Sequence, residues 1–299
     1  MEVLFRNVRE LVERAQEEEK LISEIMIEQE MRMSERSRED ILTQMERNLE
    51  VMEQAVERGL NGVQSVTGLT GGDAVLMKRY IESGKGLSGD YILDAVSKAV
   101  ATNEVNAAMG MICATPTAGS AGVVPGVLFA VKNKLNPTRE QMVRFLFTAG
   151  AFGFVVANNA SISGAAGGCQ AEVGSAAAMA AASIVEMAGG TPQQSAHAFS
   201  ISLKNMLGLV CDPVAGLVEV PCVKRNAMGA ANAMIAADMS LAGIESRIPT
   251  DEVIEAMYRI GQSMPSALRE TAQGGLAATP TGRWLEKRIF GGAVAKSVN

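Results

Sequence analysis

The sequence contains very little histidine and cysteine. Among its 299 residues there is one His and there are four Cys, none of them in a Cys-x2-Cys pair. A structural zinc site needs four closed ligands, which usually come in such pairs, so a zinc ribbon is excluded. Four scattered cysteines in a large chain are also better explained as metal ligands, catalytic groups or buried small hydrophobic residues than as a disulfide framework.

The sequence also lacks clustered positive charge, and its formal net charge is −6. Phosphate binding needs concentrated Lys and Arg, so we expect no nucleic-acid partner. Residues 1–14 mix Glu, Arg and Asn with isolated apolar residues and do not resemble a signal peptide, which predicts a cytoplasmic protein with reduced thiols. A phosphate loop and a dinucleotide-binding fingerprint are both absent.

One long stretch without charge runs from Phe145 to Ala171. Its length would cross a bilayer, but its second half contains Asn, Ser and Gly residues whose backbone groups would stay unsatisfied in lipid. We therefore interpret it as a buried helix followed by a tight loop, and we expect no membrane association.

The chain divides by composition into two regions that we expect to form one continuous structural domain. Residues 1–105 contain no Pro and are rich in Glu, Arg, Met and Leu. Their apolar residues recur every three to four positions, which predicts helices whose charged faces lie in solvent; examples are Ile41, Met45, Leu49 and Met52. Residues 106–299 are rich in Ala, Gly and Met and contain every Pro, so we expect the functional site there.

Two Ala- and Met-rich runs in the second region are strong helix candidates, residues 176–187 and 227–239. Strand signals are limited to short pairs such as Val123-Val124, and no alternating pattern is long enough to make a sheet. The sequence therefore predicts an all-α fold.

Three of the cysteines occupy positions that favour metal chemistry. Cys169 and Cys222 lie at the expected starts of helices, where free amides and the helix dipole favour thiolate, and Cys211 precedes an Asp-Pro turn. Three thiolates hold an iron-sulfur cluster while leaving one iron open to act as a Lewis acid. The alternative is that all four cysteines are inert buried thiols.

A second segment, residues 113–125, begins at Cys113 and contains Thr115, Thr117, Gly119 and Ser120. Its hydroxyl groups, together with the backbone amides of a glycine-containing turn at a helix start, could donate hydrogen bonds to a carboxylate. The alternative interpretation is an ordinary cap before a core helix, and composition does not separate the two.

Four segments resemble the α chain of the iron-sulfur-dependent L-serine dehydratases, and the resemblance covers about residues 100–280. They are Ala114-Thr-Pro-Thr-Ala-Gly-Ser-Ala-Gly122, Gly168-Cys-Gln-Ala-Glu-Val-Gly174, Cys211-Asp-Pro-Val-Ala-Gly-Leu-Val-Glu-Val-Pro-Cys222 and Arg269-Glu-Thr-Ala-Gln-Gly-Gly-Leu-Ala277. The resemblance implies an all-α catalytic chain that converts L-serine to pyruvate and ammonia without pyridoxal phosphate. It further implies that Cys169, Cys211 and Cys222 hold a [4Fe-4S] cluster, that Cys113 is not a ligand, and that a separate β chain completes a heterodimer or higher assembly.

The sequence does not identify the catalytic base. Candidates in this chain are Glu172, Lys204, Lys224 and His197, although His197 lies in an apolar helical context typical of a structural histidine. The resemblance suggests that a histidine of the β chain contributes, so we expect the α chain alone to be inactive or nearly so. Single-chain members often carry Asn where this chain has Ala118.

Two alternative functions remain. One is a related lyase acting on cysteine or threonine, and the other is a helical interaction protein with inert cysteines or a structural cluster.

Overall fold

The computed structural model describes residues 3–291, and the regular structure in that range is helical throughout. Only two isolated bridges, Gln64 with Gly71 and Cys211 with Arg269, have strand-like pairing there. The predicted all-α fold is therefore confirmed. The α-helices of the described range are α1 (Val8–Glu17), α2 (Ile22–Ser34), α3 (Arg38–Leu60), α4 (Asp73–Glu82), α5 (Asp90–Ala107), α6 (Val123–Leu135), α7 (Arg139–Asn159), α8 (Gly164–Gly167), α9 (Ser175–Met187), α10 (Pro192–Lys204), α11 (Cys222–Leu241), α12 (Thr250–Ser263) and α13 (Pro280–Phe290).

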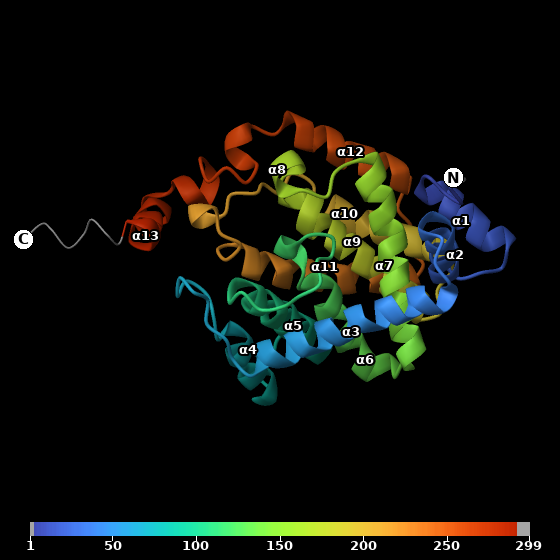
Figure 1. The fold of residues 1–299 in the computed structure, drawn as a ribbon, viewed down its shortest axis with the longest axis horizontal. Coiled ribbons are helices and arrows are strands. Elements are labelled where there is room, and N and C mark those ends of the chain that lie inside the picture. The colour runs from blue at the N-terminus through green and yellow to red at the C-terminus, as the bar shows by residue number, and fades with distance from the viewer. Residues whose placement is uncertain (1–2, 292–299) are drawn as a thin grey trace, which may run out of the picture.

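Helix α9 lies at the centre of the fold, where α6, α7, α10 and α11 pack around it (Figure 1). Every residue from Ser175 to Glu186 is buried. Its alanines present little bulk on any side, so the surrounding helices can approach closely, and the dense contact supplies favourable dispersion energy. The helices predicted over residues 176–187 and 227–239 are confirmed as α9 and α11.

Helix α7 is the one described helix that is long and apolar enough to cross a membrane. It lies against α2 and α9 in the core, and 67% of its most apolar 18-residue stretch is buried inside the protein. The Phe152 ring stacks on Phe199 of α10 with ring centroids 5.0 Å apart. The predicted buried helix is therefore present, and the loop that follows it leads into the single turn α8.

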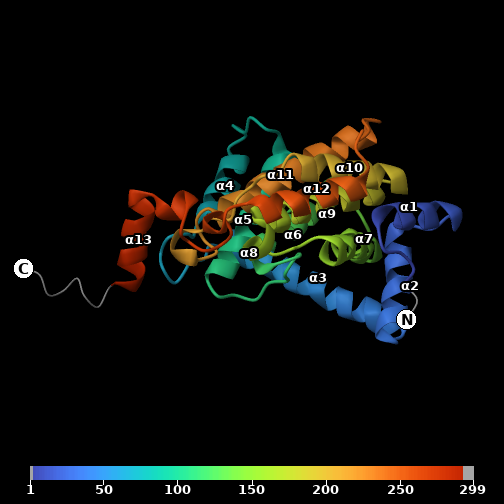
Figure 2. The ribbon, with the colours of Figure 1, turned by 90° about the horizontal axis from the view of Figure 1, so that it is seen from above.

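The N-terminal helices pack onto this core from one side and one end (Figure 2). Ile41, Leu49 and Met52 on α3 are buried as their spacing predicts, and α3 contacts α5. Helix α2 packs on α7, and α1 contacts α10 and α12. The division between residues 105 and 106 falls inside α5, and the two-region organisation stays a prediction.

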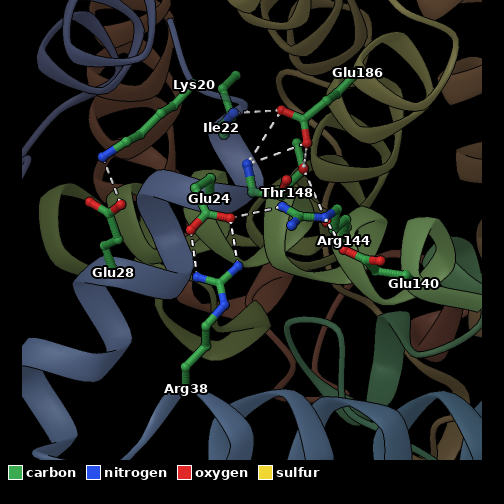
Figure 3. Close-up of polar contacts among 10 residues, drawn as sticks. Lys20, Ile22, Glu24, Glu28, Arg38, Glu140, Arg144, Thr148 and Glu186 are labelled. Atoms are coloured by element: carbon green, nitrogen blue, oxygen red, sulfur yellow. Dashed lines mark hydrogen bonds and ion pairs between the residues drawn. The ribbon is translucent and has the colours of Figure 1, made fainter. Parts of the chain in front are cut away.

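Two carboxylates fix helix α2 to the core (Figure 3). Glu186, near the end of α9, accepts hydrogen bonds from the Ile22 amide at 2.6 Å and from the Thr148 hydroxyl at 2.6 Å. It thereby caps the start of α2, whose first amides have no partner within the helix. Glu24 pairs with Arg38 through Oε2 and Nη2 at 2.8 Å and with Arg144 at 3.0 Å.

This ion-pair network should make stability depend on pH. The hydrogen bonds from Arg38 and Arg144 outweigh burial and lower the pKa of Glu24 from 4.5 to about 2. A lowered folded-state pKa stabilises the protein above pH 4.5, and that contribution disappears as the pH falls toward 2. Because Glu24 keeps 20% of its side chain exposed, we expect Glu24→Gln to lower the free energy of unfolding by about 1 to 2 kcal/mol at pH 7.

Urea unfolding of the wild type and the variant between pH 2 and pH 7 measures this difference. It should shrink below pH 4.5, and a difference independent of pH would contradict the assignment to the Glu24 charge. Glu140→Gln is the matched control, because Glu140 also pairs with Arg144 at 3.0 Å but is 70% exposed. Its effect should stay below about 0.5 kcal/mol.

Candidate functional site

Cys169 lies between α8 and α9, directly before a π-helical turn, η2 (Gln170–Gly174), that runs into α9. Its side chain is buried, with 3% of the residue exposed. Gly168 before it has φ of 77°, and a Cβ there would lie 2.8 Å from the Leu209 carbonyl oxygen. Glycine is therefore required for the chain to turn Cys169 into the core. Its predicted position at a helix start is confirmed.

The segment that begins at Cys211 and ends at Cys222 leads into α11, and we call residues 211–222 the cysteine loop. The Cys211 amide donates to the Leu268 carbonyl at 2.8 Å, and the Cys211 carbonyl accepts from the Glu270 amide at 2.6 Å. Cys222 is the first residue of α11, as predicted. Both cysteines are buried, so all three candidate ligands lie in the protein interior.

Buried charges fix the shape of the cysteine loop at both ends. Asp212 pairs with Arg225 at 2.8 Å and accepts from the Leu276 amide at 2.7 Å. Glu219, which is 5% exposed, accepts from the hydroxyl of Thr67 at 2.8 Å and from that of Thr70 at 3.0 Å. The loop is thus held by segments far away in the sequence, and sequence reasoning missed these contacts.

The predicted carboxylate-binding segment folds around a short 3-10 turn, η1 (Ala118–Ser120), capped by Thr117. Ser120 is fully buried, and its hydroxyl donates to the Thr115 carbonyl at 3.0 Å. The Thr115 hydroxyl is buried and has no hydrogen-bond partner among the described residues. A buried hydroxyl without a partner is costly, so this atom marks a place where a ligand oxygen would be favourable.

Asn226 joins this segment to α11. Its side-chain amide donates to the Gly119 carbonyl at 2.7 Å, and its oxygen accepts from the Gly122 amide at 3.0 Å. Asn226 is fully buried and lies one helical turn after Cys222. Sequence reasoning missed it, although the four-residue spacing places it on the same face as Cys222.

Glu172 connects the cysteines to the threonine segment. Its Oε1 accepts from the Thr117 hydroxyl at 2.8 Å, and its Oε2 lies 3.9 Å from the Cys211 sulfur. Burial, followed by the nearby charge of Glu270, raises the pKa of Glu172 although the Thr117 hydrogen bond opposes the shift. Gly164 packs directly against the Glu172 carboxylate and Cys211. A Cβ at Gly164 would lie only 2.7 Å from Glu172 Oε2 and 2.9 Å from the Cys211 sulfur.

The other three candidate bases have their contacts elsewhere. Lys224 forms an ion pair with Asp73 and is 62% exposed. Lys204 donates to the Ser246 hydroxyl at 2.9 Å. His197 accepts from the Ser246 amide through Nδ1 at 3.3 Å, and burial lowers its pKa.

Cys113 differs from the other cysteines. It is half-buried, and its thiol donates to the Asn48 carbonyl at 3.4 Å, which directs it toward α3. Burial raises its pKa.

Burial also keeps the three interior thiols protonated. It raises the pKa of Cys169 to about 11 and that of Cys222 to about 12, and it raises the pKa of Cys211 as well. A negative charge on Cys169 would raise the pKa of Cys211 and that of Cys222 further. The expected thiolate-favouring effect of the helix starts is therefore outweighed by burial, and a bound metal must displace these protons.

Within residues 3–291, no three His, Cys, Asp or Glu side chains converge closely enough to hold a single metal ion. A cluster with several irons has a different requirement, because each cysteine binds its own iron and the sulfurs stand farther apart. Cys169, Cys211 and Cys222 are three buried thiols, and soft sulfur donors of this kind fit an iron-sulfur cluster.

The sequence model of the serine dehydratase alpha-chain family matches residues 17–277. The chain belongs to this family. Membership in the serine dehydratase alpha-chain family confirms the resemblance found from the four motifs, and it confirms that the chain is an enzyme of the lyase class. The alternative of a non-catalytic helical interaction protein is thereby disfavoured.

Relatives in the serine dehydratase alpha-chain family include chains of the same length and longer ones. "Probable L-serine dehydratase, alpha chain" of Bacillus subtilis (strain 168) is 79% identical over 291 residues, 97% of each chain. "L-serine dehydratase, alpha chain" of Peptoniphilus asaccharolyticus is 43% identical over 286 residues, 95% of this chain and 98% of that one. An L-serine dehydratase of Escherichia coli (strain K12) is 39% identical over 263 residues, 86% of this chain but 58% of that protein.

Proposed function

We propose that this chain is the catalytic α chain of an iron-sulfur-dependent L-serine dehydratase, which converts L-serine to pyruvate and ammonia. The observation that carries the proposal is the contact of Glu172 with both Thr117 and Cys211, which joins the cysteines to the threonine segment. The names of the relatives support L-serine as the substrate in preference to cysteine or threonine. The protein would act in the cytoplasm.

We assign Cys169, Cys211 and Cys222 as the ligands of a [4Fe-4S] cluster. The donor set supports this assignment, because each of these three thiols is buried and Cys113 is directed toward α3. When bound, a cluster with three cysteine ligands supplies an open iron that acts as a Lewis acid toward the serine hydroxyl, so no pyridoxal phosphate is needed.

The chain's own residues would bind and orient the substrate. Thr115 offers a buried hydroxyl without a partner, and the adjoining Thr117, Gly119 and Ser120 form the cap beside Glu172. We place the serine carboxylate against this segment, where the Thr115 hydroxyl could donate a hydrogen bond to it. Asn226 keeps the segment in register with the start of α11.

Glu172 is the proton-transfer group that we assign to this chain. Loss of the α-proton and of the hydroxyl from serine gives aminoacrylate, which becomes an imine and is hydrolysed to pyruvate and ammonia. Burial raises the pKa of Glu172, so this carboxyl group keeps its proton to a higher pH than an exposed one does, which is typical of proton-transfer groups. The β chain would supply the second proton-transfer group, a histidine, and complete the assembly.

Mössbauer spectroscopy tests this function. The chain, with its β chain, is reconstituted anaerobically with enriched iron and sulfide, and spectra are recorded with L-serine and with L-alanine, which lacks the hydroxyl. We expect a [4Fe-4S] spectrum in which one iron changes with L-serine and none changes with L-alanine. A cluster that does not respond to L-serine, or the absence of a cluster, would refute the proposal.

A further inference from the structure

Large apolar side chains are exposed on segments that contact the cysteine loop or lead into the threonine segment. Trp284 on α13 is 57% exposed, Val66 and Met109 are each 82% exposed, and Met111 is 66% exposed. Met109 also has a φ of 58°, a left-handed conformation that is uncommon for a residue with a long side chain. Large exposed apolar residues on segments that lead into one site are candidates for an interaction surface. We call the exposed side chains of Val66, Met109, Met111 and Trp284 the arm surface.

Each segment that bears the arm surface is attached to the candidate site. Helix α13 packs mainly on two 3-10 turns, η3 (Val214–Gly216) inside the cysteine loop and η5 (Gly275–Ala278). Val66 adjoins Thr67, whose hydroxyl donates to Glu219 of the same loop. Met109 and Met111 lead into the threonine segment. In both views α13 and residues 62–71 lie at the end of the molecule opposite α1 and α2 (Figures 1 and 2).

The charge of α13 indicates what kind of surface would cover it. The helix carries Arg283, Lys287 and Arg288 against the single acid Glu286, in a chain whose net charge is −6. The Arg288 guanidinium lies 5.6 Å from the centre of the Trp284 ring. Trp and Arg together are typical of the residues that dominate binding energy at protein interfaces. The complementary partner therefore presents an apolar patch with an acidic rim.

The relatives indicate which partner this is. The chain matches 58% of the Escherichia coli enzyme, so about two fifths of that polypeptide has no counterpart here, whereas the relatives of matching length are named alpha chains. A missing portion that completes the site must meet this chain near the cysteine loop. We propose, on the basis of the function above, that the arm surface is the docking surface for the L-serine dehydratase β chain.

Binding of purified β chain to immobilised α chain tests the proposal. Trp284→Ser should weaken binding by at least about 30-fold, as expected for an aromatic anchor, and Val66→Ser with Met109→Ser should weaken it further. Lys287→Glu should weaken it and reduce its salt dependence. Because these side chains are exposed, circular dichroism and the cluster absorption of each variant should match the wild type.

Ile244→Ser is the control. Ile244 is 47% exposed and follows the C-terminal end of α11, about 30 Å along that helix from Cys222. It should bind β chain as the wild type does. If Trp284→Ser and the double variant also bind like the wild type while the assembly turns over serine, the docking surface is wrong and the proposed function stands. If the wild-type α chain binds no β chain, the proposed function fails and this surface fails with it.

Discussion

Replacing Cys169, Cys211 or Cys222 with alanine should remove the iron-sulfur cluster, whereas Cys113→Ala should retain it. Each of the three interior thiols would bind a different iron, and removing one leaves a corner iron without a protein ligand. We expect iron and sulfide per chain to fall below about one tenth of the wild-type value, and serine turnover to fall by at least about 1,000-fold.

The fold should survive these substitutions. A buried cysteine behaves as a small hydrophobic residue, and its replacement by alanine removes only the thiol group. The free energy of unfolding should therefore fall by only about 1 kcal/mol. Iron and sulfide analysis, the visible absorption of the reconstituted cluster and circular dichroism of the same samples separate loss of the cluster from loss of the fold. A variant that keeps its cluster removes that cysteine from the ligand set.

Cys113→Ala is the matched control for the ligand variants. Its thiol donates to the Asn48 carbonyl at 3.4 Å, a weak hydrogen bond to α3, and its side chain is half-buried. This variant should keep the cluster and most of the activity. Loss of the cluster from Cys113→Ala would show that the resemblance assigns the wrong three cysteines.

Local pattern was enough to predict the helices but not how they meet. Helix α9 follows from an alanine run without glycine or proline, and the buried face of α3 follows from apolar residues spaced three and four apart. The π-helical turn at Gln170–Gly174 had no such signal. Single π-helical turns are rare and often occur at functional sites, so helix propensity does not predict where they lie.

The candidate site was predictable where residues share one helical turn. Asn226 lies four positions after Cys222 in α11, a spacing that places the two side chains on one helical face. Glu172 lies three positions after Cys169 but within the π-helical turn, where the α-helical spacing does not apply. Lys224, two positions after Cys222, lies on another face and pairs with Asp73. The contact of Thr67 with Glu219 joins residues 152 positions apart, and no local pattern in a single sequence predicts it.

Glu172→Gln should lower kcat for serine by about 100- to 10,000-fold while leaving the cluster in place, which is the range expected when a proton-transfer group is removed. Glutamine keeps the size of the side chain and an oxygen that can accept from Thr117, but it cannot hold or release the proton. Glu186→Gln is the matched control, because Glu186 is also 9% exposed and its pKa is also raised by burial, yet it caps α2. That variant should lose stability and keep kcat. Steady-state kinetics with iron analysis measures both, and an unchanged kcat in Glu172→Gln would assign proton transfer to the β chain alone.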